Sequence, residues 1–284
     1  MTEQDVNTTP FKVFGQRVRG QTTRILVINP NSSQSMTDGL QPAIDALDLP
    51  SSTEIYTYTG PASSPPSIND QGDIDQSTEA VLSSLKDEES WSISFDAVLI
   101  ACFSVHPLVS RIQKLANNAI NINLAVTGIF EASILTALSL VQNEGQQWGI
   151  VTTGKFWEDH LKHGAKAFLG AGNEDQNRKF AGVQSTGLNA SDFHHGVDPA
   201  VVRQKLVEAT QRLLASDNSV PRVYVVIMGC AGMAGLESII REAAEAMYGH
   251  THAYGQLHVV DGVRAGILQL DHTIKNMRLR PGRE

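Results

Sequence analysis

The segment Asp96-Ala-Val-Leu-Ile-Ala-Cys102 is a short apolar run that ends in a cysteine, and Val223-Tyr-Val-Val-Ile-Met-Gly-Cys230 repeats this pattern later in the chain. These are the only two cysteines among the 284 residues. Each is followed by a turn of mostly small residues and then by a helical pattern. Short, continuous apolar runs are typical of strands that are covered on both faces. Because ligands of α/β proteins collect outside the carboxyl ends of such strands, we expect both thiols to line one pocket.

Further apolar runs alternate with helical patterns along the whole chain. Strands are predicted, besides the two that end in cysteine, at residues 25–28, 54–58, 122–126, 148–152, 180–185 and 257–260. Helices are predicted between them, at residues 33–47, 75–86, 107–115, 130–141, 155–168, 199–214, 236–247 and 263–274. This alternation predicts an α/β fold with doubly wound parallel sheets.

The order of these elements indicates an internal duplication. The strands that end at Asn29 and Thr153 precede Cys102 and Cys230 by nearly the same number of residues. Similar spacing between similar elements is typical of two related halves. We therefore expect two similar domains related by a pseudo-two-fold axis, with the active site in the cleft between them. The expected division is a mobile leader at 1–21, a first domain at 22–123 plus 236–284, and a second domain at 124–235.

Composition narrows the class of protein. The chain is 41% hydrophobic and 18% charged, with a net charge of −8 and no long run of one sign. Such a charge distribution predicts neither a nucleic-acid partner nor an anionic membrane partner. No apolar stretch approaches the roughly 20 residues that span a bilayer, and residues 1–21 lack the apolar middle of a secretory signal. We therefore expect a cytoplasmic protein.

Two thiols on one pocket suit a specific reaction. As a thiolate, one sulfur removes a proton from a carbon next to a carbonyl, and the other, as a thiol, returns a proton to the opposite face. Backbone N–H groups in the small-residue turn Gly229–Gly235 would stabilise the developing enolate oxygen. The alternative for each cysteine is a buried structural thiol, whereas a disulfide is disfavoured in a reducing compartment.

Five segments in order resemble the hydantoin and allantoin racemases, a branch of the aspartate/glutamate racemase superfamily. They are Ile25-Leu-Val-Ile-Asn-Pro-Asn-Ser32, Ala101-Cys-Phe-Ser104, Thr127-Gly-Ile-Phe-Glu-Ala132, Gly149-Ile-Val-Thr-Thr-Gly154 and Gly229-Cys-Ala-Gly-Met-Ala-Gly235. The resemblance runs from about Arg24 to about Gly266. It implies two α/β domains and 1,1-proton transfer on a small molecule, with no metal, pyridoxal phosphate or other cofactor. It also implies a homo-oligomer that acts in purine or nitrogen catabolism.

The resemblance also assigns roles to individual residues. It makes Cys102 and Cys230 the acid/base pair, and it matches Asn29 to a position that contacts substrate. The turns that hold the substrate's carbonyl or carboxylate groups are matched by three pairs of residues: Phe103 and Ser104, Thr152 and Thr153, and Ala231 and Gly232.

Departures from the superfamily narrow the substrate. The amino-acid racemases often carry an acid where this chain has Asn29, and a histidine close behind the second cysteine, where this chain has Ala231 and Gly232. Small, neutral surroundings favour a cyclic ureide, such as allantoin or a 5-substituted hydantoin, over aspartate or glutamate. Three alternatives stay open: an amino-acid racemase, a maleate-type isomerase, and a metabolite-binding protein without catalysis. An arylmalonate decarboxylase is disfavoured because one cysteine is enough for that reaction.

Other titratable residues have structural interpretations. His106 could lower the pKa of Cys102, but a helix-cap or surface histidine is favoured. Glu131 follows a strand-to-helix turn, where a carboxylate stabilises the helix dipole. The remaining histidine pairs lack further metal ligands at suitable spacing and are interpreted as solvated: His160 with His163, and His194 with His195.

Overall fold

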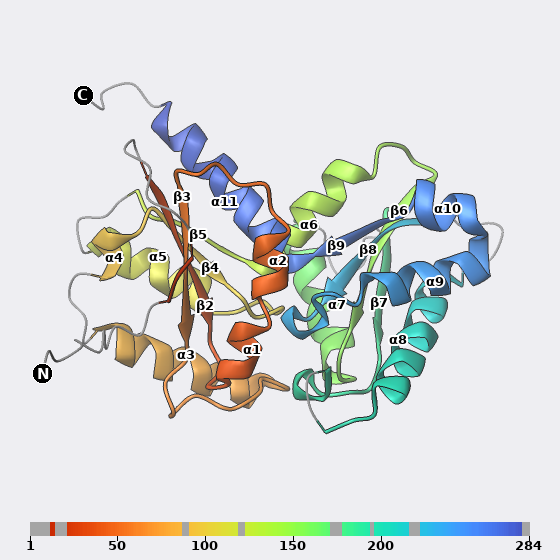
Figure 1. Ribbon diagram of the computed structural model, residues 1–284, viewed down its shortest axis with the longest axis horizontal. Helices are drawn as coiled ribbons and strands as arrows, with labels where there is room; N and C mark the ends of the chain where they lie inside the picture. The colour runs from red at the N-terminus through yellow and green to blue at the C-terminus, as the bar shows by residue number, and fades with distance from the viewer. Residues whose placement is uncertain are drawn as a thin grey trace, which may run out of the picture.

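Two sheets, lying side by side with helices around them, form the protein (Figure 1). The computed structural model describes residues 12–14, 22–86, 91–118, 123–170, 178–193, 196–215 and 222–279. In spatial order the first sheet is β1 (Lys12–Phe14), β3 (Thr53–Thr59), β2 (Thr23–Asn29), β4 (Ala97–Ile100) and β5 (Ala125–Gly128). The second is β7 (Phe180–Ser185), β6 (Gln146–Thr152), β8 (Arg222–Gly229) and β9 (His258–Asp261). Apart from β1, which is antiparallel to β3, the paired strands are parallel, so the predicted fold class is confirmed.

Most of the helices follow the predicted apolar patterns, whereas those at Trp91–Ser94 and His250–Gly255 were not predicted. The helices are α1 (Gln34–Asp38), α2 (Gln41–Asp45), α3 (Gln71–Lys86), α4 (Trp91–Ser94), α5 (Leu108–Asn118), α6 (Ile129–Leu140), α7 (Phe156–Phe168), α8 (Pro199–Leu214), α9 (Glu237–Tyr248), α10 (His250–Gly255) and α11 (Gly262–Arg278), with short 3-10 turns η1 (Ala190–Phe193) and η2 (Ala231–Met233). One predicted helix is two. Ser33 caps α1, and Gly39 and Leu40 separate α1 from α2, in which Pro42 occupies the first turn. Proline is tolerated there because its missing N–H has no partner in a first turn.

The two sheets repeat one strand order. The order β3-β2-β4-β5 in the first sheet corresponds to β7-β6-β8-β9 in the second. Ile28 pairs with Ile100 in the first sheet, and Val151 pairs with Met228 in the second. This register makes Cys102 equivalent to Cys230, and it makes Asn29 equivalent to Thr152, one residue before the position that strand spacing alone suggested.

The division into domains differs from the expected one at two strands. We expected residues 124–235 to form the second domain and 236–284 to complete the first. Instead β5 belongs to the first sheet and β9 to the second. The helices after these strands then cross over, because α6 packs on β8 and β9 whereas α11 packs on β4 and β5. The expected boundaries therefore assign α6 and α11 to the correct halves but assign β5 and β9 to the wrong ones.

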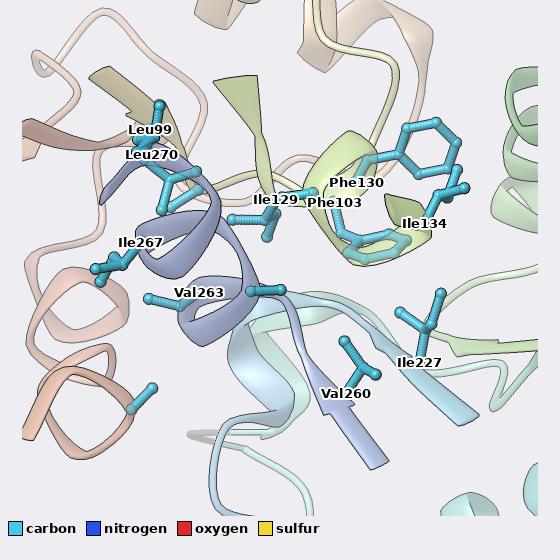
Figure 2. Packing of buried hydrophobic residues seen from close by; sticks show 14 of the residues in the cluster. Leu99, Phe103, Ile129, Phe130, Ile134, Ile227, Val260, Val263, Ile267 and Leu270 are labelled. Atoms are coloured by element: carbon cyan, nitrogen blue, oxygen red, sulfur yellow. The ribbon is translucent and has the colours of Figure 1, made fainter. Parts of the chain in front are cut away.

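The crossed helices bury a core that both halves share. Figure 2 shows Leu99 of β4, Ile129 of α6, Ile227 of β8 and Val263 of α11 in one cluster of buried side chains. Where α11 crosses β4, a Cβ on Gly266 would lie 2.3 Å from a methyl carbon of Leu99. The helix can therefore approach the sheet this closely only with glycine at this position.

The expected leader is only partly described. Within residues 1–21, strand β1 pairs with β3 in the first sheet, so this stretch contains an element that we did not predict. The rest of residues 1–21 lies outside the described residues.

Candidate active site

Cys102 and Cys230 line one pocket at the carboxyl ends of the equivalent strands β4 and β8. The pocket holds about 390 Å³ of empty space, part of it open to solvent. Both cysteines are free and partly buried. One sulfur from each half therefore reaches the same small cavity.

The pocket includes some of the predicted substrate-binding residues and excludes others. Besides the cysteines, its lining includes Asn29, Phe103, Thr153 and Ala231. The remaining predicted residues lie outside the lining: Ser104, Thr152 and Gly232. Ser104 and Gly232 each hydrogen-bond to the sulfur of a cysteine instead. The Thr152 hydroxyl donates to the Gly229 carbonyl at 2.8 Å and so links the ends of β6 and β8.

The side chain of Asn29 is occupied by the turn that it begins. Its Nδ2 lies 2.8 Å from Asn31 Oδ1, 2.9 Å from Thr37 Oγ1 and 3.2 Å from the Ser33 carbonyl oxygen. These bonds satisfy the amide donors within the loop, although Asn29 borders the pocket. Asn29 therefore shapes the turn between β2 and α1.

Asn31 is better placed to meet a ligand. It lines the pocket, and the partner of its Nδ2 is the Met36 sulfur at 3.3 Å. A thioether is a weak acceptor, so this amide retains most of its capacity to donate. The Thr153 hydroxyl also borders the pocket and makes no hydrogen bond to another residue of the described ranges. Asn31 and Thr153 are the neutral polar groups available to a substrate.

Sequence reasoning missed several lining residues. They include Asn31, Met36, Ile68, Trp157 and Ala190, which come from loops, α1, α7 and η1. Asn31 was signalled by the Asn-Pro-Asn turn. Trp157 is only 3% exposed and belongs to the core as well as to the pocket wall. The other three carry no chemical signal in the sequence, because only the packing of distant segments brings them to the pocket.

The environment of Cys102 disfavours its thiolate. The pKa of Cys102 is raised to about 12, mainly by burial and to a smaller extent by the charges of Cys230 and Glu131, while a hydrogen bond with Ser104 opposes the rise. The Sγ–Oγ distance to Ser104 is 3.4 Å. That Cys230 acts on Cys102 electrostatically is consistent with two sulfurs on one cavity.

Backbone N–H groups surround the other sulfur. Burial raises the pKa of Cys230 to about 11, and hydrogen bonds from the N–H groups of Gly232 and Met233 oppose the rise. The Gly232 N–H lies 3.3 Å from the sulfur, which caps η2. These N–H groups were expected to stabilise an enolate, but in the structure they stabilise Cys230 itself.

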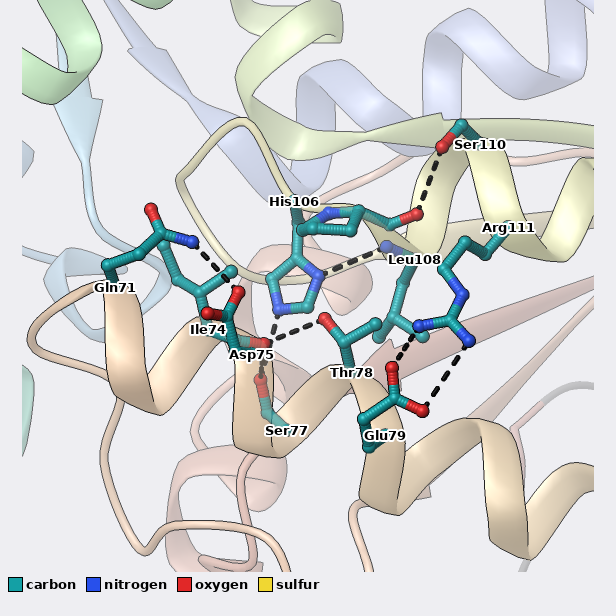
Figure 3. Close-up of polar contacts among 11 residues, drawn as sticks. Gln71, Ile74, Asp75, Ser77, Thr78, Glu79, His106, Leu108, Ser110 and Arg111 are labelled. Atoms are coloured by element: carbon teal, nitrogen blue, oxygen red, sulfur yellow. Dashed lines mark hydrogen bonds and ion pairs between the residues drawn. The ribbon is translucent and has the colours of Figure 1, made fainter.

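His106 is buried rather than exposed, and it anchors the Cys102 loop (Figure 3). Its Nδ1 accepts from the Leu108 N–H at 3.3 Å, which is a role at the start of α5, and its Nε2 lies 3.2 Å from Ser77 Oγ on α3. Burial lowers its pKa to about 3, so the ring is neutral. His106 is therefore a helix-start residue that ties the loop to α3.

Among the described residues, the other histidines have no partners that indicate a metal site. His160 is half-buried against Phe156 and Trp157, which corrects its interpretation as solvated, while His163 is exposed. His194 and His195 lie outside the described residues. In the described ranges, no three His, Cys, Asp or Glu side chains gather closely enough to hold a metal ion. None of the helices described there has both the length and the apolar character needed to cross a membrane.

Two similar α/β units with a thiol at each of two equivalent strand ends are the arrangement expected of a two-domain racemase. The family model described as Asp/Glu/Hydantoin racemase matches residues 25–270. The chain belongs to this family, and membership makes it an isomerase.

Individual relatives agree with this assignment. The chain is 34% identical to protein DCG1 of Saccharomyces cerevisiae over 219 residues, covering 76% of this chain and 85% of DCG1. It is 24% identical to a hydantoin racemase of a Pseudomonas species over 245 residues, covering 86% and 83% of the two chains. The crystal structure of allantoin racemase from Pseudomonas fluorescens superposes with a TM-score of 0.68 at 22% identity, covering 92% of this chain and 99% of the other. At this identity the superposition establishes the fold.

Proposed function

We propose that this protein racemises a cyclic ureide, either allantoin or a 5-substituted hydantoin, by proton transfer between Cys102 and Cys230. The observation that carries the proposal is that the two sulfurs line one pocket whose other described lining residues are uncharged. A free amino acid or a dicarboxylate needs charged partners when it is buried, whereas a neutral ring needs only hydrogen bonds. The names of the hydantoin and allantoin racemases among its relatives support the same substrate class.

In the proposed reaction, the ring lies between the two sulfurs. One sulfur, as thiolate, removes the proton from the ring C–H next to the carbonyl, and the electron pair moves onto the carbonyl oxygen as an enolate. The other sulfur, as thiol, protonates the same carbon from the opposite face and restores the carbonyl. The sulfurs have then exchanged protonation states, and transfer through solvent resets them. Asn31 and Thr153 are positioned to donate to the ring oxygens.

The test uses the purified full chain with enantiopure allantoin and 5-isopropylhydantoin. Chiral chromatography follows loss of optical purity, and proton NMR in D₂O follows exchange at the stereocentre, both against a protein-free control that measures spontaneous racemisation. We expect deuterium incorporation together with inversion. Aspartate, glutamate and maleate serve as comparison substrates.

Three results would contradict the proposal. Turnover of aspartate or glutamate but not of the ureides would make the protein an amino-acid racemase. Turnover of maleate alone would make it a maleate-type isomerase. Binding of a ureide without exchange or inversion would make it a metabolite-binding protein.

We further propose that the enzyme works in the cytoplasm as a homo-oligomer, without a cofactor, in the catabolism of purines or other nitrogen compounds. The support is the family resemblance. Light scattering after size-exclusion chromatography tests the oligomer, and activity retained after treatment with EDTA and exhaustive dialysis tests independence from a dissociable cofactor. A monomer, or activity that needs an added cofactor, would contradict the respective part.

A further inference from the structure

The loop that carries Cys102 is held by both halves of the protein. It comprises residues 101–107, between β4 and α5. On the side of the first half, His106 ties the loop to α3. Two further side chains of the loop, Phe103 and Val105, contact helices of the second half instead.

Phe103 packs against α6, which lies on β8 and β9 of the second half. Its ring meets that of Phe130 edge-on, with a centroid distance of 5.5 Å and an interplanar angle of 88°. Figure 2 shows both side chains in the core that the halves share. Because Phe103 also lines the pocket, this contact fixes part of the pocket wall relative to the second half.

Val105 meets α7 of the second half at a glycine. A Cβ on Gly164 would lie 2.4 Å from Val105 Cγ2 and 3.2 Å from Phe130 Cζ. The first distance is far inside the roughly 3.5–4.0 Å at which two carbon atoms pack best. Valine is stiff because its Cβ is branched, so its methyl groups have few other positions. Val105 can therefore rest on α7 in this way only because Gly164 has no side chain.

A tight turn joins Val105 to the reactive sulfur. The Ser104 N–H donates to the Cys102 carbonyl at 3.0 Å, and the Ser104 hydroxyl lies 3.4 Å from the Cys102 sulfur. Ser104 is fully buried, so the turn has little room to adjust. A displacement of Val105 would therefore also move the Cys102 sulfur.

The loop of Cys230 packs within its own half. Counted from the two cysteines, Met233 is the residue equivalent to Val105. Met233 is fully buried in a core cluster of second-half residues, among them Val151 and Leu206. The second half therefore positions Cys230 by itself, whereas Cys102 sits on a loop that rests on both halves.

We propose that the contact between Val105 and Gly164 sets the position of the Cys102 sulfur relative to Cys230. Both sulfurs are then referred to the second half, although they come from different halves. Val105 and Gly164 lie outside the pocket lining, so they are positioning residues. The catalytic meaning of this contact rests on the proposed function, whereas the placement of the loop is a property of the free protein.

Gly164→Ala tests the contact, because its methyl group enters the space of Val105. We expect the loop to shift and expose the Cys102 sulfur, so alkylation of Cys102 by iodoacetamide should become about threefold faster or more, while that of Cys230 stays unchanged. Mass spectrometry of the modified peptides measures both rates. With a ureide substrate, kcat should fall about tenfold or more, since misplacement by about 1 Å can cost on the order of 100-fold, and KM should change little.

Val105→Ala provides the rescue. It removes the methyl carbon that Gly164→Ala would meet. Alone, Val105→Ala leaves a gap on α7, so alkylation of Cys102 should become about twofold faster. In the double variant the new methyl group on α7 fills that gap. Alkylation of Cys102 should then be slower than in either single variant, and kcat should recover to within about threefold of the wild-type value.

Two control variants separate positioning from stability. Gly149→Ala places a methyl group 2.6 Å from Leu213 Cδ1, between β6 and α8, so it should lower stability by overpacking without changing alkylation of Cys102. Val105→Thr keeps the shape of an exposed side chain and should behave as the wild type.

Two results overturn the inference. One is a Gly164→Ala variant, folded by circular dichroism, in which Cys102 is alkylated at the wild-type rate. The other is an effect of Gly164→Ala that Val105→Ala does not reverse in the double variant. If Gly164→Ala does not fold, Val105→Ala is compared with Val105→Thr, and equal Cys102 rates in these two variants overturn the inference as well. Because alkylation needs no substrate, a protein that racemises no ureide can still pass this test, so the two proposals fail separately.

Discussion

The first and second halves of this protein share a strand order but support their cysteines differently. In the first half, Cys102 is followed by a loop that His106 ties to α3. In the second half, Cys230 caps a 3-10 turn, and the position equivalent to His106 is Ala234. The same topology therefore places two identical functional groups, while the residues around them differ in charge and titration. Duplication supplies the geometry, and local substitutions supply the chemical difference between the halves.

Replacing either cysteine by serine gives the largest expected effect. A positioned acid or base contributes roughly 10²–10⁴-fold to a rate, so we expect each single variant to lose at least about 100-fold in racemisation. Each variant should still exchange deuterium into one enantiomer, the one that faces its remaining sulfur. Chiral chromatography and NMR in D₂O measure both. Near-normal inversion by either variant would show that the two halves are not a catalytic pair.

The pH dependence of the reaction should reflect the raised pKa values of both thiols. Catalysis needs one of the two cysteines to be ionised. The lower of the two pKa values is that of Cys230, at about 11. Well below that value the thiolate fraction grows tenfold per pH unit, so we expect kcat/KM to rise about 100-fold from pH 7 to 9. This pH dependence is measured from initial rates with a hydantoin that carries no substituent on its ring nitrogens. The rates are corrected for spontaneous racemisation. A flat profile would mean that a thiolate already exists at pH 7.

Gly229, just before Cys230, tests how closely β8 must approach β6. A Cβ there would lie 2.9 Å from the Val151 carbonyl oxygen and 2.7 Å from a methyl carbon of Ile150. Overpacking of this kind costs about 1–3 kcal/mol, so Gly229→Ala should lower the free energy of unfolding by that amount. Urea denaturation measures it. The equivalent residue in the first half is Ala101, so a Cβ is accommodated at that position of the first sheet. If Gly229→Ala were as stable as the wild type, the second sheet would accommodate a Cβ there as well.

His106 in the first half of the protein should make the free energy of unfolding depend on pH, and the second half has no equivalent residue that titrates. Its pKa is about 3 when folded, against about 6.5 unfolded, so between these values the unfolded state binds more protons. Its contribution to stability is therefore complete above about pH 6.5 and is lost as pH falls toward 3. From pH 7 to 5 this group should cost about 2 kcal/mol.

His106→Asn provides the comparison for that measurement. Asparagine can accept from the Leu108 N–H but does not titrate, so urea unfolding of this variant should change less between pH 7 and 5 than that of the wild type. Equal losses for the two proteins would assign the acid sensitivity to other groups. Ala234 cannot contribute a matching effect in the second half because it does not titrate.

Much of this architecture could be predicted from local patterns. The strand 180–185 and the helix 199–214 were predicted with the bounds that the structure has. Both are defined by local signals, which are the apolar pattern and, for the helix, the proline at its start. The helix expected at 33–47 is divided in two. Gly39 ends the first helix, and Pro42 lies in the first turn of the second, so both effects are confined to the turn around each residue. The pocket's thiols were predicted because topology places carboxyl ends of parallel strands together.

The errors have one physical origin. Which sheet receives β5 and β9, and which sheet α6 and α11 then cover, depends on packing between segments far apart in the chain. The same is true of Trp157, which is both a core residue and part of the pocket wall. Local sequence does not report such contacts.

By itself the sequence determined the strand and helix pattern, the duplication and the two thiols, because each is written in residue type and spacing within a short stretch. Only the tertiary structure decided which sheet receives β5 and β9, which helices then cover each sheet, and that Arg264 is neutralised by Glu237. Electrostatic effects depend on distance and burial in space, and these are set when remote segments pack together.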